Sequence, residues 1–187
     1  YSPTVIPFND AYRYMDWLLT VPLLVIELVA VLGLAREVTR RLSTKLAVAA
    51  AIMIILGYPG EISSQLSQQW IFWVLSMIPF LYIIYKLFTE FSKHYQDQPN
   101  EVRPLVNKAR GIIVVTWFFY PLAYLAPLVG FGAAAGETTL QVGYTIADIV
   151  AKVGLGIYIY FIAVAKSRAD GWEPEKPATG AKEAPAT

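Results

Sequence analysis

Five long apolar runs dominate this sequence and constrain its fold more than any other feature. Each run has about the 20 residues that an α-helix needs to cross the hydrocarbon core of a lipid bilayer. A helix satisfies its own backbone hydrogen bonds, as a segment exposed to lipid must, so these runs predict helices. We therefore expect an all-α membrane protein, built as a transmembrane helix bundle. The runs cover approximately residues 11–33, 44–63, 69–92, 108–130 and 139–166.

The composition supports a membrane location and argues against several other classes of protein. Hydrophobic residues make up 56% of the chain and charged residues only 16%, whereas a soluble domain is about one quarter charged. The chain has no cysteine, which excludes thiolate chemistry, and its single histidine, His94, argues against a histidine-rich metal centre. We expect no metal. The net charge of +1 gives no reason to expect a nucleic-acid partner, so the expected surroundings are membrane lipid.

The end of the chain differs in composition from the rest. From Gly171 to Thr187 it is rich in Ala, Pro, Glu, Lys and Gly, a mixture that buries too little apolar surface to fold. We therefore expect two parts, a transmembrane bundle over residues 1–168 and a disordered cytoplasmic tail over residues 169–187.

The basic residues predict how the bundle is oriented. Of the 15 Lys and Arg residues, all but Arg13 and Lys152 lie on or beside alternate connections between the runs, or on the tail. Connections rich in Lys and Arg stay on the cytoplasmic side of a membrane. The pattern predicts a multi-pass protein of the cell membrane, with the tail in the cytoplasm and the start of this chain outside.

Two acidic residues of the first run, in the stretch YRYMDWLLTVPLLVIEL, share one helix face. Glu27 follows Asp16 by eleven residues, so at about 100° per residue both point in nearly the same direction, roughly 16 Å apart along the axis. Thr20 lies one turn after Asp16, and Arg13 lies about one turn before it. Unpaired charges in a membrane are costly and mark functional sites. Two acids on opposite sides of the midpoint favour directional proton transfer. Because Glu27 lies among apolar residues, we expect its side chain to be buried, which favours its protonated form.

The last run contains the stretch ADIVAK, in which Asp148 and Lys152 lie one helical turn apart. A buried lysine readily loses its proton and can form a Schiff base with an aldehyde. If Asp16 and Asp148 flank Lys152, a cationic derivative of that lysine has two counter-charges, and Arg13 balances the surplus negative charge. The simpler interpretation is a structural salt bridge within one helix.

Aromatic residues from three runs predict a pocket. In the stretch TWFFYPLAYL, aromatic side chains recur at spacings of three and four, and Pro121 bends the helix there. With two tryptophans from other runs they would form a flat box around a long apolar ligand, although such stripes also occur in ordinary packing. The residues concerned are Trp17, Trp73, Trp117, Tyr120 and Tyr124.

For three other ionisable residues, the sequence favours a structural or solvated role. Glu61, in GYPGEIS, is expected near the outer surface as a structural residue. Glu137 and His94 fall on connections, where a solvated side chain is the favoured interpretation.

Three of these stretches, in this order, resemble the microbial rhodopsins, a family of retinal-binding, light-driven membrane proteins. RYMDW resembles the family's third helix, WFFYPLAY the sixth, and YTIADIVAKVG the seventh, which carries the retinal lysine. The likeness covers nearly all of residues 5–168. It implies that the runs are five of the seven helices of the microbial rhodopsin fold, the third to the seventh, and that the chain is a fragment of a longer protein.

The resemblance also implies a role for each ionisable residue of the runs. These roles follow from the positions that match the family's motifs. Lys152 is the Schiff-base lysine for all-trans retinal, Asp16 the primary counterion and proton acceptor, Glu27 the proton donor, Asp148 the second counterion, Arg13 a residue that tunes Asp16, and Thr20 a hydrogen-bonding neighbour of Asp16.

The set of Asp16, Thr20 and Glu27 is similar to that of the proteorhodopsin and xanthorhodopsin proton pumps. Archaeal pumps carry Asp at the donor position, and chloride pumps lack an acid at the position of Asp16. The resemblance therefore implies a light-driven outward proton pump, an ion transporter rather than an enzyme. Two alternatives stay open, a sensory photoreceptor on the same scaffold and a retinal-free transporter subunit.

The resemblance implies a retinal pocket with particular properties. Leu24 occupies the position that tunes colour, and an apolar side chain there resembles green-absorbing members. Members with a carotenoid antenna carry glycine where Trp73 aligns, so we expect no antenna. Leu140 replaces the outer glutamate of archaeal pumps, which leaves the proton-release group unassigned, and a homo-oligomer is expected by resemblance alone. The implied pocket residues are Trp17, Val21, Leu24, Met53, Gly57, Trp73, Trp117, Tyr120 and Tyr124.

Overall fold

The computed structural model describes residues 9–129 and 136–172, apart from the side chains of Pro127 and of residues 136–140. The expected disorder of the tail falls mainly on residues 173–187, which lie outside the described residues, so the division into bundle and tail stays a prediction. The helices, in chain order, are α1 (Asp10–Ala30), α2 (Arg36–Glu61), α3 (Leu66–Lys93), α4 (Arg103–Leu128), α5 (Gly136–Asp148), a π-helical segment η1 (Ile149–Gly154) and α6 (Leu155–Ala169).

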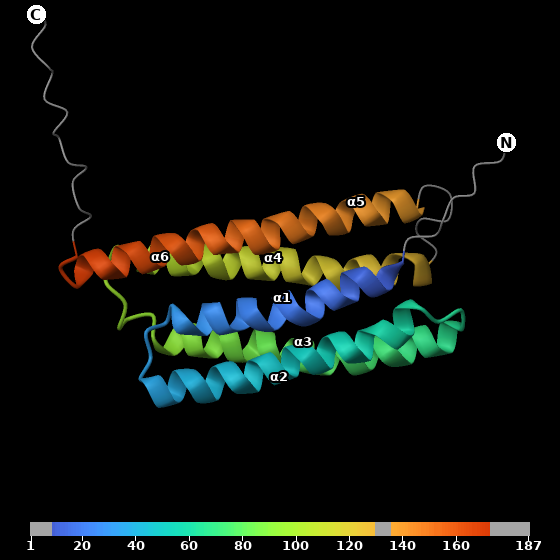
Figure 1. Cartoon of the computed structure of the whole chain (residues 1–187), viewed down its shortest axis with the longest axis horizontal. Coiled ribbons are helices and arrows are strands. Elements are labelled where there is room, and N and C mark those ends of the chain that lie inside the picture. Colours follow the sequence, from blue (N-terminus) through green and yellow to red (C-terminus); the bar gives the residue numbers. More distant parts are fainter. Residues whose placement is uncertain (1–8, 130–135, 173–187) are drawn as a thin grey trace, which may run out of the picture.

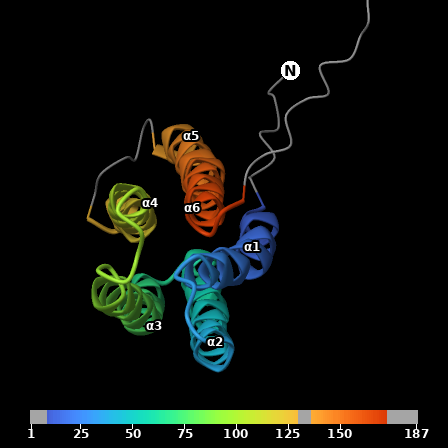
Figure 2. The ribbon, with the colours of Figure 1, turned by 90° about the vertical axis from the view of Figure 1, so that its left-hand side faces the viewer.

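The described residues form a bundle of five rods, one for each apolar run, because α5, η1 and α6 follow one another as a single continuous rod (Figure 1). Viewed from the end, the rods form a ring in the order α1, α2, α3, α4 and the α5–α6 rod (Figure 2). α2 packs against both α1 and α3, and α4 packs against the α5–α6 rod. The prediction of an all-α helix bundle is confirmed.

Two helices begin before their apolar runs, at stretches that contain basic residues. α2 begins at Arg36 rather than near residue 44, and α4 begins at Arg103 rather than near residue 108. Hydropathy marks the width of the hydrocarbon core, whereas a helix continues into the headgroup region wherever good helix formers such as Arg, Glu and Lys are present. The predicted number and order of helices are therefore confirmed, while the predicted starts of α2 and α4 are too late.

Four of the described rods are long and apolar enough to cross a membrane by length and composition, namely α2, α3, α4 and the α5–α6 rod. α1 is not among them, although its 21 residues correspond to about 31 Å. The difference comes from its ionisable residues, which interrupt the apolar run. The helix outside this set is thus the one that carries several of the candidate residues: Arg13, Asp16 and Glu27.

Local sequence signals set the two ends of α1. Asn9 caps its start, because the Asn9 Oδ1 atom accepts a hydrogen bond of 3.1 Å from the backbone amide of Ala11. Beyond its last turn, Gly33 has φ of 67°, a left-handed conformation that glycine adopts without steric cost and that lets the chain reverse into α2.

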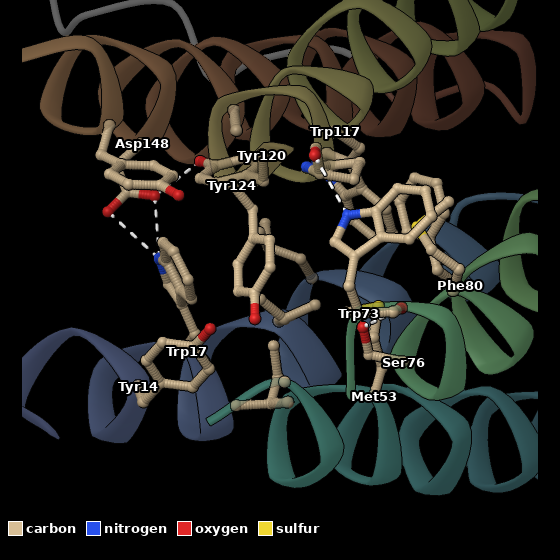
Figure 3. A pocket seen from close by; sticks show the side chains of 18 of the residues that line it. Tyr14, Trp17, Met53, Trp73, Ser76, Phe80, Trp117, Tyr120, Tyr124 and Asp148 are labelled. Carbon is tan, nitrogen blue, oxygen red and sulfur yellow. Dashed lines mark hydrogen bonds between the residues drawn. The ribbon is translucent and has the colours of Figure 1, made fainter. Parts of the chain in front are cut away.

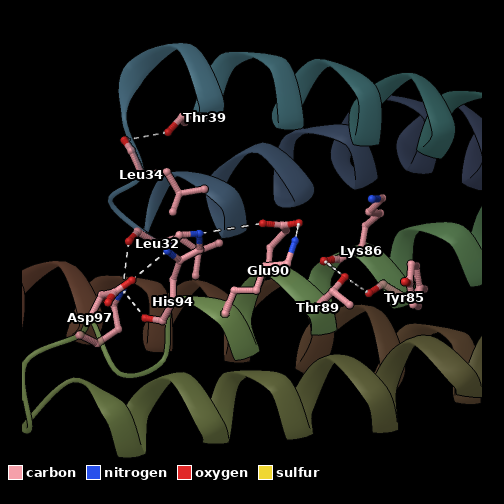
Figure 4. Close-up of polar contacts among 11 residues, drawn as sticks. Leu32, Leu34, Thr39, Tyr85, Lys86, Thr89, Glu90, His94 and Asp97 are labelled. Atoms are coloured by element: carbon pink, nitrogen blue, oxygen red, sulfur yellow. Dashed lines mark hydrogen bonds and ion pairs between the residues drawn. The ribbon is translucent and has the colours of Figure 1, made fainter.

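Polar contacts hold together one end of the bundle, which we call the basic end because it carries the α1–α2 and α3–α4 connections and the end of α6 (Figure 1). Buried Gln98 donates from Nε2 to the carbonyl of Leu32, 3.1 Å away, and ties the α3–α4 connection to α1. His94 lies at the end of α3, with Nδ1 3.0 Å from Asp97 and Nε2 4.0 Å from Glu90 (Figure 4). His94 is therefore more constrained than the solvated loop residue expected from the sequence.

The core of the bundle has two parts that differ in side-chain type. The aliphatic half contains the most deeply buried side chains and lies toward the basic end. The aromatic half lies toward the other end, which we call the opposite end. The aliphatic half includes Val25, Leu28, Val29, Leu46, Leu87, Ile113, Leu155 and Ile162, and the aromatic half includes Tyr14, Trp17, Tyr58, Phe119, Tyr120 and Tyr144.

Candidate functional site

Lys152 lies in η1, where the α5–α6 rod changes from α-helical to π-helical geometry. A π-helical turn accommodates extra backbone within a helix and is frequent at functional sites. The regular periodicity of the sequence did not predict this turn. The π-helical turn widens the rod locally at Lys152, the residue for which the sequence predicts reactivity.

The Lys152 amine pairs with carboxylates from two elements. Nζ donates a hydrogen bond to Oδ2 of Asp16 on α1 and lies 3.5 Å from Oδ2 of Asp148. The two aspartates therefore flank Lys152, and a salt bridge confined to one helix does not describe the site. One cation between two carboxylates leaves a net negative charge, which a further cation must balance if the group is to be stable away from water.

The Asp148 carboxylate accepts hydrogen bonds from two other helices (Figure 3). The indole Nε1 of Trp17 on α1 donates to Oδ1 at 3.1 Å, and the hydroxyl of Tyr120 on α4 donates to the same oxygen at 2.6 Å. Hydrogen bonds to a charged acceptor are shorter and stronger than those between neutral groups. Together with Lys152 they fix the position of the carboxylate relative to α1, α4 and η1.

Asp16 is less enclosed than Asp148. Its side chain is 46% exposed, compared with 25% for Asp148. Thr20 Oγ1 donates to the backbone carbonyl of Asp16 at 2.9 Å, a bond that Thr commonly makes within a helix. Thr20 thus lies beside Asp16, but its hydroxyl donates to the backbone carbonyl and not to the Asp16 carboxylate. The carboxylate accepts its hydrogen bond from Lys152.

Arg13 lies about one turn before Asp16 and is buried, with 9% of its surface exposed. Its Nη1 atom lies 3.2 Å from Oδ1 of Asp10, and its guanidinium group lies 4.4 Å from the ring centroid of Tyr144. An ion pair and a cation–π contact both stabilise a buried guanidinium group. An open cavity lined by Arg13, Asp16, Tyr144 and Asp148 places this charge beside the two aspartates.

A pocket beside Lys152 is lined by all nine residues that the resemblance implied. Asp148 lies at one side of this pocket, and Trp73 and Phe80 lie at the other (Figure 3). The Trp73 Nε1 atom donates to the carbonyl of Pro121 at 3.2 Å, which joins α3 to α4. The wall is mostly apolar and aromatic, and its charged groups are Asp148 and Lys152. Such a pocket suits a long apolar ligand with one polar, reactive end, because a few polar groups are enough to orient a ligand.

The sequence interpretation missed part of the pocket wall. Helical spacing identifies some of these residues, because Ser76 and Phe80 follow Trp73 by three and seven positions. Others depend on how the helices are packed. The additional lining residues are Tyr14, Ile54, Ser76, Met77, Phe80, Pro121, Tyr144 and Ala151.

Glu27 is exposed within the described residues, whereas the sequence led us to expect a buried side chain. Its neighbours Val25 and Leu28 are fully buried, with 0% of their surface exposed. The reason is geometric, because residues one or two positions apart point in different directions around a helix. Glu27 shares its exposed face with Leu19 and Leu23, so whatever covers that face also sets its environment.

Known proteins with similar sequences include proteorhodopsins and bacteriorhodopsins. The model of the bacteriorhodopsin-like protein family matches residues 6–166. The green-light absorbing proteorhodopsin of Gamma-proteobacterium EBAC31A08 is 34% identical over 171 residues, which are 89% of this chain and 64% of that protein. Bacteriorhodopsin-I of Haloquadratum walsbyi is 33% identical over 154 residues, which are 80% of this chain and 58% of that protein. The chain thus spans less than two thirds of the length of either relative.

Solved structures agree with the sequence comparison. The structure of xanthorhodopsin, described as a light-driven ion pump with dual chromophore, matches with a TM-score of 0.85 and 48% identity over 92% of this chain and 69% of that chain. Thermophilic rhodopsin matches with a TM-score of 0.85 and 42% identity over the same shares, 92% and 69%. With its apolar helices, the chain is a multi-pass membrane protein that belongs to the bacteriorhodopsin-like family of microbial rhodopsins.

Proposed function

We propose that the protein is a light-driven proton pump that carries all-trans retinal on Lys152 as a Schiff base and moves protons outward, from the basic end to the opposite end. The observation that carries this proposal is the position of Lys152, which pairs with two aspartates and lines a pocket rich in aromatic side chains. The names of its relatives, a green-light absorbing proteorhodopsin and a light-driven ion pump, support the same activity.

The pocket residues fit retinal, which is long, flat and apolar and has an aldehyde at one end. The aldehyde would react with the Lys152 amine, and the aromatic rings of Trp17, Trp117 and Tyr120 would confine the chain. Retinal supplies the absorption of light and a light-driven change of shape. Everything that follows concerns protons held by the protein's own side chains.

The proton that Lys152 releases would pass to Asp16. Nζ of Lys152 already donates a hydrogen bond to Oδ2 of Asp16, so the transfer needs little rearrangement. Asp148 accepts from Trp17 and Tyr120 in addition, and these bonds keep its carboxylate in place as the counter-charge while Asp16 changes its protonation. The different partners of the two aspartates thus favour Asp16 as the acceptor and Asp148 as the second counterion.

Glu27 would return a proton to Lys152 from the basic end. It lies on α1 beyond Asp16 in the direction of that end, which carries the basic connections that the positive-inside rule assigns to the cytoplasm. A proton supplied there and released at the opposite end moves outward. In a sensory photoreceptor on the same scaffold, slow return of this proton would prolong a signalling state, so Glu27→Gln would leave the photocycle rate unchanged instead of slowing it.

Three expectations about the pigment stay predictions. Leu24 lies in the pocket wall and predicts a green-absorbing pigment. Trp73 fills the position that glycine occupies in members with an antenna, and predicts that no carotenoid binds there. A homo-oligomer is expected from the family resemblance.

The proposal is tested by adding all-trans retinal to membranes that contain the full-length protein and recording the visible spectrum. We expect an absorption band well to the red of free retinal, and its absence in Lys152→Ala. Lys166→Ala, which alters a lysine near the end of the same rod, is the matched control and should keep the band. No band in the unaltered protein would favour a retinal-free transporter subunit.

A further inference from the structure

Glu61 lies at the opposite end of the bundle and has no role in the proton path derived above. It is the last residue of α2 and is only partly exposed, whereas the next residue, Ile62, is 60% exposed. The sequence suggested a structural residue near a surface. Glu61 thus lies where the bundle meets the α2–α3 connection, and its side chain can contact both the bundle and water.

The neighbours of Glu61 come from α1 and are themselves polar. Tyr14 packs against the last turns of α2, because its hydroxyl oxygen would lie 3.4 Å from a Cβ atom on Gly57, one turn before Glu61. Arg13 attracts the negative charge of Glu61, and Asp10 repels it. Arg13 and Tyr14 are buried, with 9% of each surface exposed. Glu61 is therefore partly buried beside buried polar residues of α1.

Close packing at the end of α2 holds Glu61 in this position. A Cβ atom on Gly60 would collide with the hydroxyl of Tyr124 and would lie 2.9 Å from Cβ of Phe72. Only glycine therefore permits this approach of α2 to α3 and α4. The Tyr124 hydroxyl also donates to the carbonyl of Gln69 at 3.1 Å, which fixes α4 against the start of α3.

Polar groups connect Asp16 to Glu61 through Arg13. Asp16, Arg13 and Tyr144 line one cavity. The guanidinium group of Arg13 lies over the ring of Tyr144, and Arg13 is also an electrostatic neighbour of Glu61. The path from the acceptor to the end of α2 thus passes along charged and hydroxyl-bearing side chains of the aromatic half.

We propose that Glu61 is the carboxylate that releases the proton at the opposite end. Its carboxyl group gives one proton to water at the α2–α3 connection, and the resulting carboxylate takes up one proton when Asp16 loses its own. The balance is one proton released for each proton that Asp16 received from Lys152. The inference rests on the proposed pump and assigns to it an exit residue.

The test is a flash experiment on the full-length protein with retinal, in which a pH-sensitive dye in the aqueous phase times the release of protons. We expect Glu61→Gln to keep its visible band and to delay release by at least about tenfold, because the Gln side chain holds no exchangeable acid proton. Glu37→Gln removes an exposed carboxylate from the other end of α2 and is the matched control, with unchanged timing.

Release on the normal timescale in Glu61→Gln would overturn the proposal. If Asp16→Asn stops pumping in the same preparation, the pump stands and only the exit residue is wrong. If Asp16→Asn pumps normally, the proposed function itself has failed.

A second measurement decides the matter if Glu61→Gln forms no pigment. Light-induced infrared difference spectra of Glu61→Asp, which keeps an acid at this position, should show a shifted carboxyl band at the time of release. A band at the same frequency as in the unaltered protein would assign the release to another carboxyl group and overturn the proposal.

Discussion

The aromatic half and the aliphatic half of the bundle differ in what they offer to a proton that leaves Lys152. Toward the opposite end lie a cavity and the polar side chains of Arg13, Asp16 and Tyr144. Toward the basic end lie packed side chains such as Val25 and Leu28, which are fully buried. Charged groups are costly in an apolar core, so the first direction is favoured. The asymmetry of the two halves, more than any single residue, gives the proposed transport its direction.

The largest expected effect comes from removing the acceptor in the aromatic half. Asp16→Asn keeps the shape of the side chain but removes the carboxylate that takes the Lys152 proton in the proposed pump, so light-driven proton transport should fall by at least about 100-fold. A pH electrode in an illuminated membrane suspension measures this rate. Asp170→Asn, at an exposed position beyond α6, is the control and should transport normally. Substantial transport by Asp16→Asn would show that the path does not begin at this residue.

The second effect concerns packing in the aliphatic half. Leu28→Ala opens a cavity at a position with 0% exposure, and should lower the free energy of unfolding by about 3 kcal/mol. Denaturant titration of the pigment measures this change. The matched control is Leu23→Ala on the same helix, because Leu23 is 57% exposed and its loss should cost much less. Equal effects of the two changes would contradict the assignment of a packed core to this face of α1.

A smaller effect is expected where the two halves meet. Tyr120→Phe removes the 2.6 Å hydrogen bond to Asp148 and should lower the free energy of unfolding by about 2 kcal/mol, the range for a bond to a charged group. Thermal bleaching of the pigment provides the readout. Tyr85→Phe, at a tyrosine that is 62% exposed on α3, should have no comparable effect. If both variants bleach alike, Asp148 does not depend on its bond from α4.

The smallest effect is expected at Thr20, and it tests whether the Thr20 hydroxyl bonds to the backbone or to the carboxylate of Asp16. Thr20 donates to the backbone carbonyl of Asp16, a bond that adds little to helix stability. Thr20→Val, which keeps the shape, should therefore change the rate of transport by less than about twofold. A loss as large as that of Asp16→Asn would mean that the hydroxyl turns to the Asp16 carboxylate during transport.

The sequence predicted those parts of the site that depend on spacing within one helix. Asp148 and Lys152 share a face, and Trp117 and Tyr120, which the aromatic spacing of α4 predicted as pocket residues, lie in the pocket wall. The family resemblance added the rest of the predicted wall. The lengths of the apolar runs predicted the number and order of the rods. They did not predict where the helices start, because an apolar run shows which residues lie in the hydrocarbon core and a helix can extend beyond it.

Features that depend on packing between helices were not predictable in this way. The sequence favoured a structural role for Glu61, whose neighbours on α1 become apparent only when α1 and α2 pack together. The π-helical geometry at Lys152 leaves no periodic signal in a single helix. Glu27 was expected to be buried because its neighbours are apolar, but the helix turns those neighbours inward and Glu27 outward.

The most direct test of the account places the full-length protein with retinal in sealed vesicles of known orientation. Under illumination, a pH-sensitive dye reports the proton concentration on each side of the membrane. We predict acidification on the side of the opposite end, where α2 and α3 connect, and its loss when a protonophore is added. No change of pH, or acidification on the side of the basic end, would contradict outward transport through the aromatic half.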